Sequence, residues 1–174
     1  MTPVETDGEA APNRFFFSTA RDLYFLTYTI AIIIHETQTE KGGVVDPGKL
    51  PFLVPFVTDA RLADIAVRRH AGLPISLDDR IRVHSAETQG RRLRPLVHRL
   101  IFSLAERGHL AITGTSAATA EVAVPKGSPL YELASDRIFQ YERQNLRHIR
   151  GIVKLRQARS GTLRERLFFV SEDF

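Results

Sequence analysis

The chain has no cysteine and no tryptophan, and its one methionine is Met1. Without cysteine, the protein has no disulfide, no thiolate metal ligand and no cysteine nucleophile. The rest of the composition is typical of a globular protein, with 43% hydrophobic and 25% charged residues among 174. This length predicts one domain, which we place at residues 14–174.

Long apolar runs are also missing. The most apolar stretch, residues 23–34, has twelve residues, whereas a membrane-spanning helix needs ~20. We therefore expect a buried core helix here and no membrane contact. Residues 1–13 are polar, with two prolines and a glycine, and we expect a disordered tail. No signal peptide pattern is visible, so we expect a cytoplasmic protein.

Lysine is scarce, with 4 lysines against 20 arginines, and the formal charge is +4. The first thirteen residues carry three acids and no base, which leaves about +7 on the remainder. A basic body favours anionic partners such as nucleic acid or an acidic protein face. Many basic proteins bind no nucleic acid, so that alternative stays open.

The apolar spacing predicts several helices. We expect a helix from Ser18 or Thr19 to about Gln38, and a helical region over 50–70 that kinks or breaks at Pro55. Residues 73–90 look like a connector, although Ser76, Asp78 and Asp79 form a reasonable helix start. A last helix is predicted over 129–159, and residues 163–170 fit either a strand or a further helix.

The clearest pattern is a helical spacing of apolar residues that ends before Gly108. Its members are Leu93, Leu96, Val97, Leu100, Ile101 and Leu104. Two short strands, HLAITG and AEVAVP, follow around a Gly-Ser-Thr turn. Helix, glycine, strand, turn and strand form the end of a winged-helix domain, here over about 91–125. The predicted fold is mainly α with a small β-hairpin: a winged-helix-like α+β domain plus a long C-terminal helix.

One basic cluster precedes Pro95 and consists of Arg91, Arg92 and Arg94. Proline favours the first turn of a helix, so these cations would crowd a helix N-terminus and attract an anion such as phosphate. Two alternatives remain open. Acids at positions 78, 79 and 87 can neutralise the cluster locally, or the helix starts earlier and Pro95 kinks it. Of this helix, only Arg94, His98, Arg99 and Ser103 could reach base edges.

A second basic cluster has the spacing of one helix face and consists of Arg143, Arg147, Arg150 and Lys154. Arg156 and Arg159 extend its positive charge. We expect it to bind nucleic acid or an anionic partner. A solvated helix face is the alternative, and in both cases exposed charges should contribute only ~0–1 kcal/mol per pair to stability.

Catalytic motifs are not found. Residues 43–49 have the spacing GxxxxGK, but Leu50 replaces the serine or threonine that holds magnesium in a phosphate-binding loop. His35-Glu36 does not extend to HExxH, and no GxSxG occurs. We expect no enzyme activity, no cofactor, no metal and no small-molecule substrate.

Two segments carry a family resemblance. KLPFLVPFVTDARLADI (49–65) and RRLRPLVHRLIFSLAERGHLAI (91–112) resemble the middle component of bacterial three-component ABC-ATPase systems. The resemblance implies a winged-helix-like accessory subunit beside a coiled-coil, SMC- or Rad50-like ATPase and an effector subunit, as in Lamassu-type anti-phage defence. It implies no catalytic residues.

Together with the resemblance, these observations predict a non-catalytic subunit that bridges the ATPase and the effector. Its basic residues would face DNA, without sequence specificity, or an acidic partner surface. The alternative is a free-standing winged-helix transcription regulator, which would usually dimerise and bind a palindrome. The mostly apolar character of the presumed recognition helix favours the first hypothesis.

Overall fold

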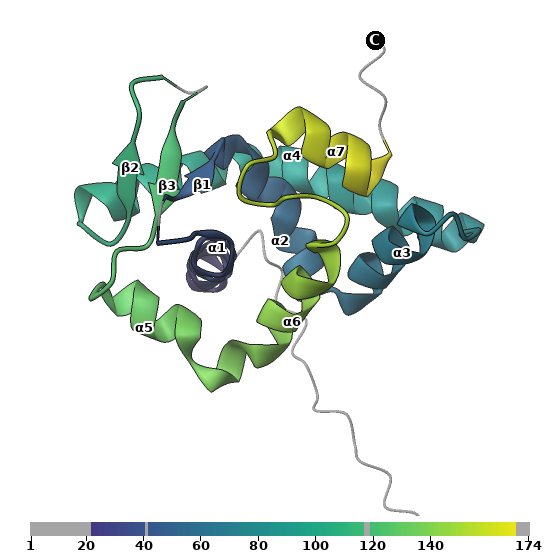
Figure 1. Cartoon of the computed structure of the whole chain (residues 1–174), viewed down its shortest axis with the longest axis horizontal. Coiled ribbons are helices and arrows are strands. Elements are labelled where there is room, and N and C mark those ends of the chain that lie inside the picture. The colour runs from purple at the N-terminus through teal and green to yellow at the C-terminus, as the bar shows by residue number, and fades with distance from the viewer. Residues whose placement is uncertain (1–21, 41, 117–118, 170–174) are drawn as a thin grey trace, which may run out of the picture.

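The computed structural model describes residues 22–40, 42–116 and 119–169 of the chain. Over these residues the protein is mainly helical, with seven α-helices and a small antiparallel sheet (Figure 1). The main statement of the predicted fold class is therefore confirmed. The predicted tail, residues 1–13, and the possible helix start at residues 18 and 19 lie outside the described residues.

Helix α1 (Leu23–Thr37) lies at the centre of the fold, where Figure 1 views it end-on. Asp22 is extended and caps it by accepting a hydrogen bond from the Phe25 amide at 3.0 Å, so α1 begins later than the predicted start at Ser18 or Thr19. The run Ile30 to Ile34 is almost completely buried, and each buried isoleucine contributes about 1.5–3 kcal/mol. The predicted core helix is confirmed, and within the described residues no helix is long and apolar enough to cross a membrane.

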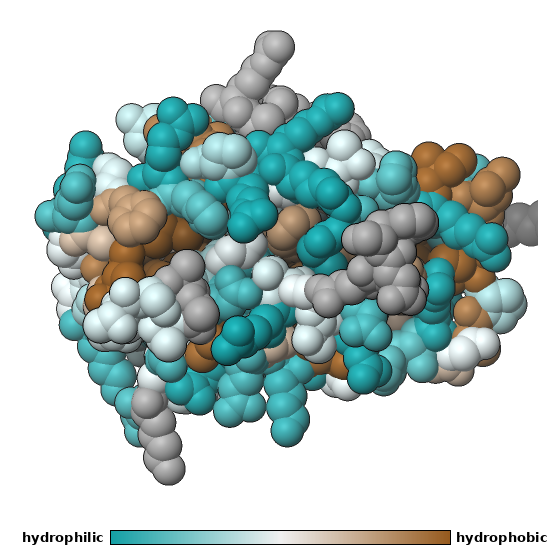
Figure 2. Space-filling model, turned by 90° about the horizontal axis from the view of Figure 1, so that it is seen from above, coloured by the Kyte–Doolittle hydropathy of each residue, from teal (hydrophilic) through white to brown (hydrophobic). Residues whose placement is uncertain are grey.

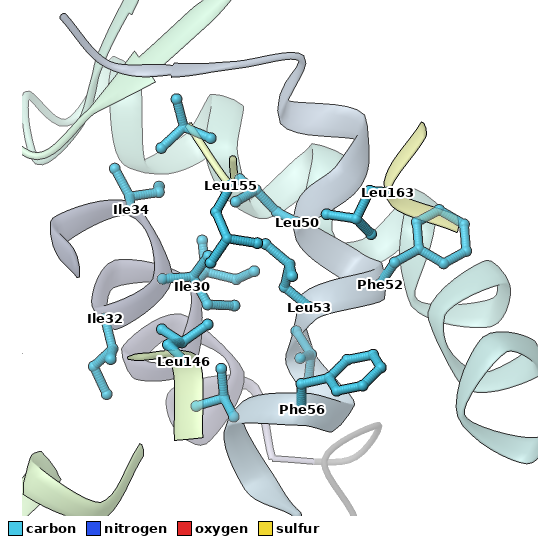
Figure 3. Close-up of a cluster of buried hydrophobic side chains, with 14 of the residues drawn as sticks. Ile30, Ile32, Ile34, Leu50, Phe52, Leu53, Phe56, Leu146, Leu155 and Leu163 are labelled. Atoms are coloured by element: carbon cyan, nitrogen blue, oxygen red, sulfur yellow. The ribbon is translucent and has the colours of Figure 1, made fainter. Parts of the chain in front are cut away.

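The predicted helical region 50–70 forms two helices, α2 (Leu50–Thr58) and α3 (Ala60–His70), after a short 3₁₀ turn η1 (Pro47–Lys49). The break is at Asp59 rather than Pro55, because Asp59 is extended and its carboxylate caps α3 through the Arg61 amide. In Figure 3, residues of α2 face α1 and Leu146 across the core.

Helix α4 (Leu77–Glu106) has 30 residues, so the predicted connector over 73–90 is wrong. Ser76 caps it, as its spacing to Asp79 suggested, and the Asp79 amide donates to the Ser76 hydroxyl at 3.1 Å. The helix continues through Pro95, which has no N–H for the Arg91 carbonyl. Both residues are exposed, so water can replace the missing donor.

Gly90 explains how α4 approaches α2 so closely. A Cβ atom at Gly90 would lie 2.6 Å from the Phe52 ring and 3.1 Å from its Cα atom. Any side chain at this position would therefore force α4 away from α2. Leu93, Val97 and Ile101, which belong to the predicted apolar pattern, lie on the same side of α4 and are buried in the core.

The sheet has the strand order β1-β3-β2, all antiparallel: β1 (Val44–Val45), β2 (Ala111–Thr113) and β3 (Glu121–Ala123). The predicted hairpin corresponds to β2 and β3, and β1 adds the third strand through the pair Val44 and Val122. Gly108 follows α4 with φ 74°, a left-handed conformation that suits a residue ending a helix.

The prediction of one long C-terminal helix over 129–159 is wrong. This region forms α5 (Pro129–Ser135), the 3₁₀ turn η2 (Arg137–Phe139) and α6 (Gln140–Ile149), followed by turns. Asp136 is extended, and its carboxylate accepts a hydrogen bond from the Ile138 amide at 3.0 Å, which starts a new element. Helix α7 (Ser160–Phe168) follows and decides between the two options for 163–170.

Substitutions on α4 test which of its leucines belong to the core. Leu100 is buried, whereas Leu96 and Leu104 are partly buried at the edge of the core. Leu100→Ala should lower the free energy of unfolding by ~2–5 kcal/mol, and Leu96→Ala by less. Urea unfolding measures both losses, and an unchanged stability of the Leu100 variant would contradict this packing.

Candidate binding surface

Three arginines of the second basic cluster converge on one carboxylate, that of Glu36 in the last turn of α1. The distances to Glu36 oxygens are 3.7 Å from Arg143 Nε, 3.2 Å from Arg147 Nε and 3.8 Å from Arg150 Nη2. The Glu36 side chain is only 8% exposed. Glu36 therefore neutralises part of this cluster, so its three arginines are neither a free binding face nor a purely solvated one.

Arg143 is the most enclosed member of this cluster, with 11% of its side chain exposed. Its Nη1 atom also donates to the carbonyl oxygens of Ala134 and Asp136, at 2.8 and 2.6 Å. It therefore joins α6 to the end of α5 and to α1. Arg150 and Lys154 lie beyond the last residue of α6, so the four cations do not form one helix face.

Glu87, on α4, joins two further arginines. Its Oε1 atom lies 2.8 Å from Arg91 Nη2 and 2.7 Å from Arg164 Nη2 of α7. Burial alone would raise the pKa of Glu87, but hydrogen bonds from Arg164 and Arg91 outweigh it and hold the pKa below its usual value. Because α4 begins at Leu77, the expectation that Arg91, Arg92 and Arg94 stand at a helix N-terminus is wrong. Of these three arginines, Glu87 neutralises Arg91.

Asp79, in the first turn of α4, repeats this arrangement with α3. Arg61 and Arg68 donate to its two oxygens at 3.1 and 3.3 Å. Burial acts to raise the pKa of Asp79. Hydrogen bonds from Ser76, Arg61 and Arg68 together lower it by more, so the pKa lies below its usual value. The start of α4 is thus held by its own cap and by α3.

Lys49 and Arg156 bind backbone carbonyls instead of a ligand. The buried Lys49 ammonium donates to the carbonyls of Arg156 and Ala158 at 2.9 and 2.6 Å. Burial lowers the pKa of Lys49 to about 8. The negative charge of Asp46 opposes this shift, and the positive charge of Arg156 adds to it. Arg156 Nε in turn donates to the carbonyls of Gly42 and Gly43. The GxxxxGK segment therefore serves to hold the turn before α7.

The ten predicted binding residues thus divide into two sets. Half of them are tied to described acids or carbonyls: Arg91, Arg143, Arg147, Arg150 and Arg156. The other half are exposed, and no ion pair joins them to a carboxylate among the described residues: Arg92, Arg94, Arg99, Lys154 and Arg159. Three of these five lie on α4, which makes α4 the main site of free positive charge.

Helix α4 also exposes large apolar side chains that the sequence analysis did not single out. Leu77, Ile81 and Phe102 are 71%, 59% and 63% exposed, and Leu73, just before the helix, is 52% exposed. The sequence did contain a pattern that indicates them, because Leu77, Ile81 and Phe102 share the helical spacing of Arg92 and Arg99. This spacing places all five opposite the buried residues of α4. The pattern was missed because residues 73–90 were predicted to be a connector and not part of a helix.

Among residues 22–40, 42–116 and 119–169, no group of three histidine, aspartate or glutamate side chains is placed to hold a metal ion. His35 is enclosed, with Nδ1 lacking a hydrogen-bond partner, and burial lowers its pKa. Its ring packs edge-on against Tyr131, with centroids 4.7 Å apart, so its surroundings are those of a core residue.

Comparisons with known proteins give no relative. No protein-family model matches the chain, and no match was found among the curated proteins or the solved structures. The candidate surface therefore depends on the geometry of this chain alone.

The paired and unpaired members of the second basic cluster should contribute differently to the stability of the protein. Arg143→Ala leaves Glu36 and two carbonyls short of a charged donor, and should cost about 1–3 kcal/mol. Lys154→Ala removes an exposed charge and should change stability by less than ~0.5 kcal/mol. Chemical unfolding of both variants measures the difference. Equal losses would show that Arg143 is not the structural member of this cluster.

Proposed function

We propose that this protein is a non-catalytic binding subunit and that α4 carries its main contact surface. The observation that carries the proposal is the exposed side of α4. It combines arginines that no described carboxylate neutralises with large apolar side chains. Exposed apolar residues beside unpaired cations are typical of a surface that is covered in a complex.

The order of elements supports a winged-helix-like arrangement within this subunit. Helix α4 is followed by Gly108 and by the β2–β3 hairpin, and β1 completes a three-stranded sheet. In this interpretation, α4 corresponds to the recognition helix and the hairpin to the wing. The domain boundaries of this segment are then wider than 91–125, because α4 begins at Leu77.

The resemblance to the middle component of three-component ABC-ATPase systems supports a more specific proposal. One of its two segments forms α2 and the start of α3, and the other runs from α4 into β2. The helices that carry these segments, α2 and α4, pack together where Phe52 meets Gly90, one residue before the second segment. We therefore assign the chain as a cytoplasmic accessory subunit that links a coiled-coil ATPase to an effector in anti-phage defence.

DNA enters this proposal as a non-specific ligand of the complex. Arg94, Lys154 and Arg159 are exposed and can neutralise phosphates, and such contacts carry no sequence information. The alternative, a free-standing regulator, draws support from the same helix and hairpin. The apolar side chains at both ends of α4 count against it, because a duplex offers them no matching surface along its phosphate backbone.

The neighbouring genes test the proposal first, because such a subunit should have a coiled-coil ATPase encoded beside it. Co-expression with that ATPase then tests assembly. The two proteins should co-elute in size-exclusion chromatography, and DNA retention should fall steeply with salt and vary little between unrelated duplexes. The triple variant Arg92→Ala/Arg94→Ala/Arg99→Ala should weaken DNA retention or assembly and keep its melting temperature. Arg107→Ala/Arg137→Ala/Arg166→Ala, which removes three exposed arginines outside α4, is the matched control.

Two results would contradict the proposal. One is a chain that elutes apart from the ATPase and binds a single sequence on the order of 10³-fold tighter than random DNA, which is the behaviour of a regulator. The other is a triple variant that assembles and retains DNA as well as the control does. In that case α4 would be a solvated surface.

A further inference from the structure

The exposed side of α4 has an ordered sequence of side chains along its length. We name it the α4 stripe, and its members recur every three or four residues: Leu77, Ile81, His84, Thr88, Arg92, Pro95, Arg99 and Phe102. Such spacing puts side chains on one helix face. The apolar members lie at the two ends, and the cations lie between them.

The two ends of the stripe are far apart. Ile81 and Phe102 are separated by 21 positions, which is about 31 Å along an α-helix. Figure 1 shows α4 extending along the long axis of the molecule, from α3 to the hairpin. A partner that covers both ends must therefore be elongated and about as straight as α4 itself.

Charge in the middle of the stripe has one sign, whereas the exposed acids Asp78 and Glu106 stand beside its two ends. Between Asp79 and Glu106 the only acid on α4 is Glu87, and its carboxylate is bound by Arg91 and Arg164. Neither Arg92 nor Arg99 forms an ion pair with a carboxylate of the described residues. The middle of the stripe is therefore complementary to acidic side chains.

The surface around Ile81 has the relief that helix packing requires. One groove lies towards α3 and is lined by Asp59, Leu62 and Ile81. A second lies further along α4 and is lined by Ile81, Arg92 and Leu96. Ile81 and Ser85 line both grooves and so belong to the ridge between them, and helices pack by fitting ridges into grooves. Figure 2 shows hydrophobic side chains gathered at the end of the molecule where α3 meets α4.

We propose that the α4 stripe binds an acidic amphipathic helix of a partner protein. The partner helix has apolar side chains at both ends of the contact, to cover Ile81 and Phe102, and acids between them, to pair with Arg92 and Arg99. Neither a phosphate backbone nor a lipid surface offers ridges for the two grooves. This inference rests on the proposed function and specifies the part of the partner to which α4 binds.

A designed peptide tests the inference without the natural partner. The probe is a synthetic helix of about 28 residues, with leucines 21 positions apart on one face and glutamates between them. Its matched control has lysines in place of the glutamates. Fluorescence anisotropy with the full chain should show the acidic peptide bound at least about tenfold tighter than the basic one.

Variants of the chain separate the apolar ends from the charged centre. Ile81→Ser/Phe102→Ser should weaken the acidic peptide about tenfold, and Arg92→Glu/Arg99→Glu should reverse the preference so that the basic peptide binds more tightly. Both variants change exposed residues, so their melting temperatures should match that of the unchanged chain. Arg137→Glu/Arg166→Glu, away from the stripe, should leave both affinities unchanged.

Several outcomes would overturn the inference. These are equal affinity for the two peptides, no measurable binding of either, or tighter binding of a duplex of about 20 base pairs or of anionic lipid vesicles. If the ATPase co-elutes and the peptides fail, the inference alone is wrong. If the peptide binds with the predicted preference and the ATPase does not co-elute, the α4 stripe stands and the assignment to an ATPase complex is wrong.

Discussion

Pairing between enclosed carboxylates and arginine side chains decides which cations of this protein are free. Glu36, Asp79 and Glu87 have side chains that are 8%, 5% and 7% exposed, and each lies between two or three arginines. A carboxylate that leaves water without such donors loses several kcal/mol of solvation. These pairs therefore fix the arginines that touch them, and they join α1 to α6, α3 to α4, and α4 to α7.

The position of the free charge follows from these pairs. Glu87 draws Arg91 to one side of α4, towards Arg164 of α7, and leaves Arg92 and Arg99 on the exposed side. Burial of Leu93, Val97 and Ile101 fixes the rotation of α4, so the opposite side must face outward. The α4 stripe is thus a consequence of how the core and the ion pairs orient one helix.

Much of the fold could be predicted where one short-range pattern decides the structure. The apolar spacing from Leu93 to Leu104 predicted a buried helix face, and Gly108 predicted its end. The start of α4 was missed because Gly90 is buried without a side chain, so the apolar spacing is interrupted there. The long C-terminal helix was predicted wrongly because the polar residue Asp136 acts as a cap, which competes with continuation of the helix.

The candidate site was harder to predict, because its composition depends on contacts between distant residues. Arg147 and Glu36 are 111 positions apart, and Arg164 and Glu87 are 77 apart. No local pattern distinguishes Arg147, which is paired, from Arg99, which has no carboxylate partner among the described residues. The sequence alone shows that arginines are abundant. Only the fold shows which of them hold helices together and which face outward.

The exchange of arginine Nε–H protons with water, followed by NMR, tests this division most directly. A hydrogen bond slows such exchange, because the proton must first be released. The account predicts slow exchange at Arg164 and Arg156, whose Nε atoms donate to Glu87 and to the carbonyls of Gly42 and Gly43. It predicts fast exchange, at the rate of a free guanidinium, at Arg92, Arg94 and Arg99. Slow exchange at the three α4 arginines in the isolated chain would show that they are already bound within the protein, and would contradict the account.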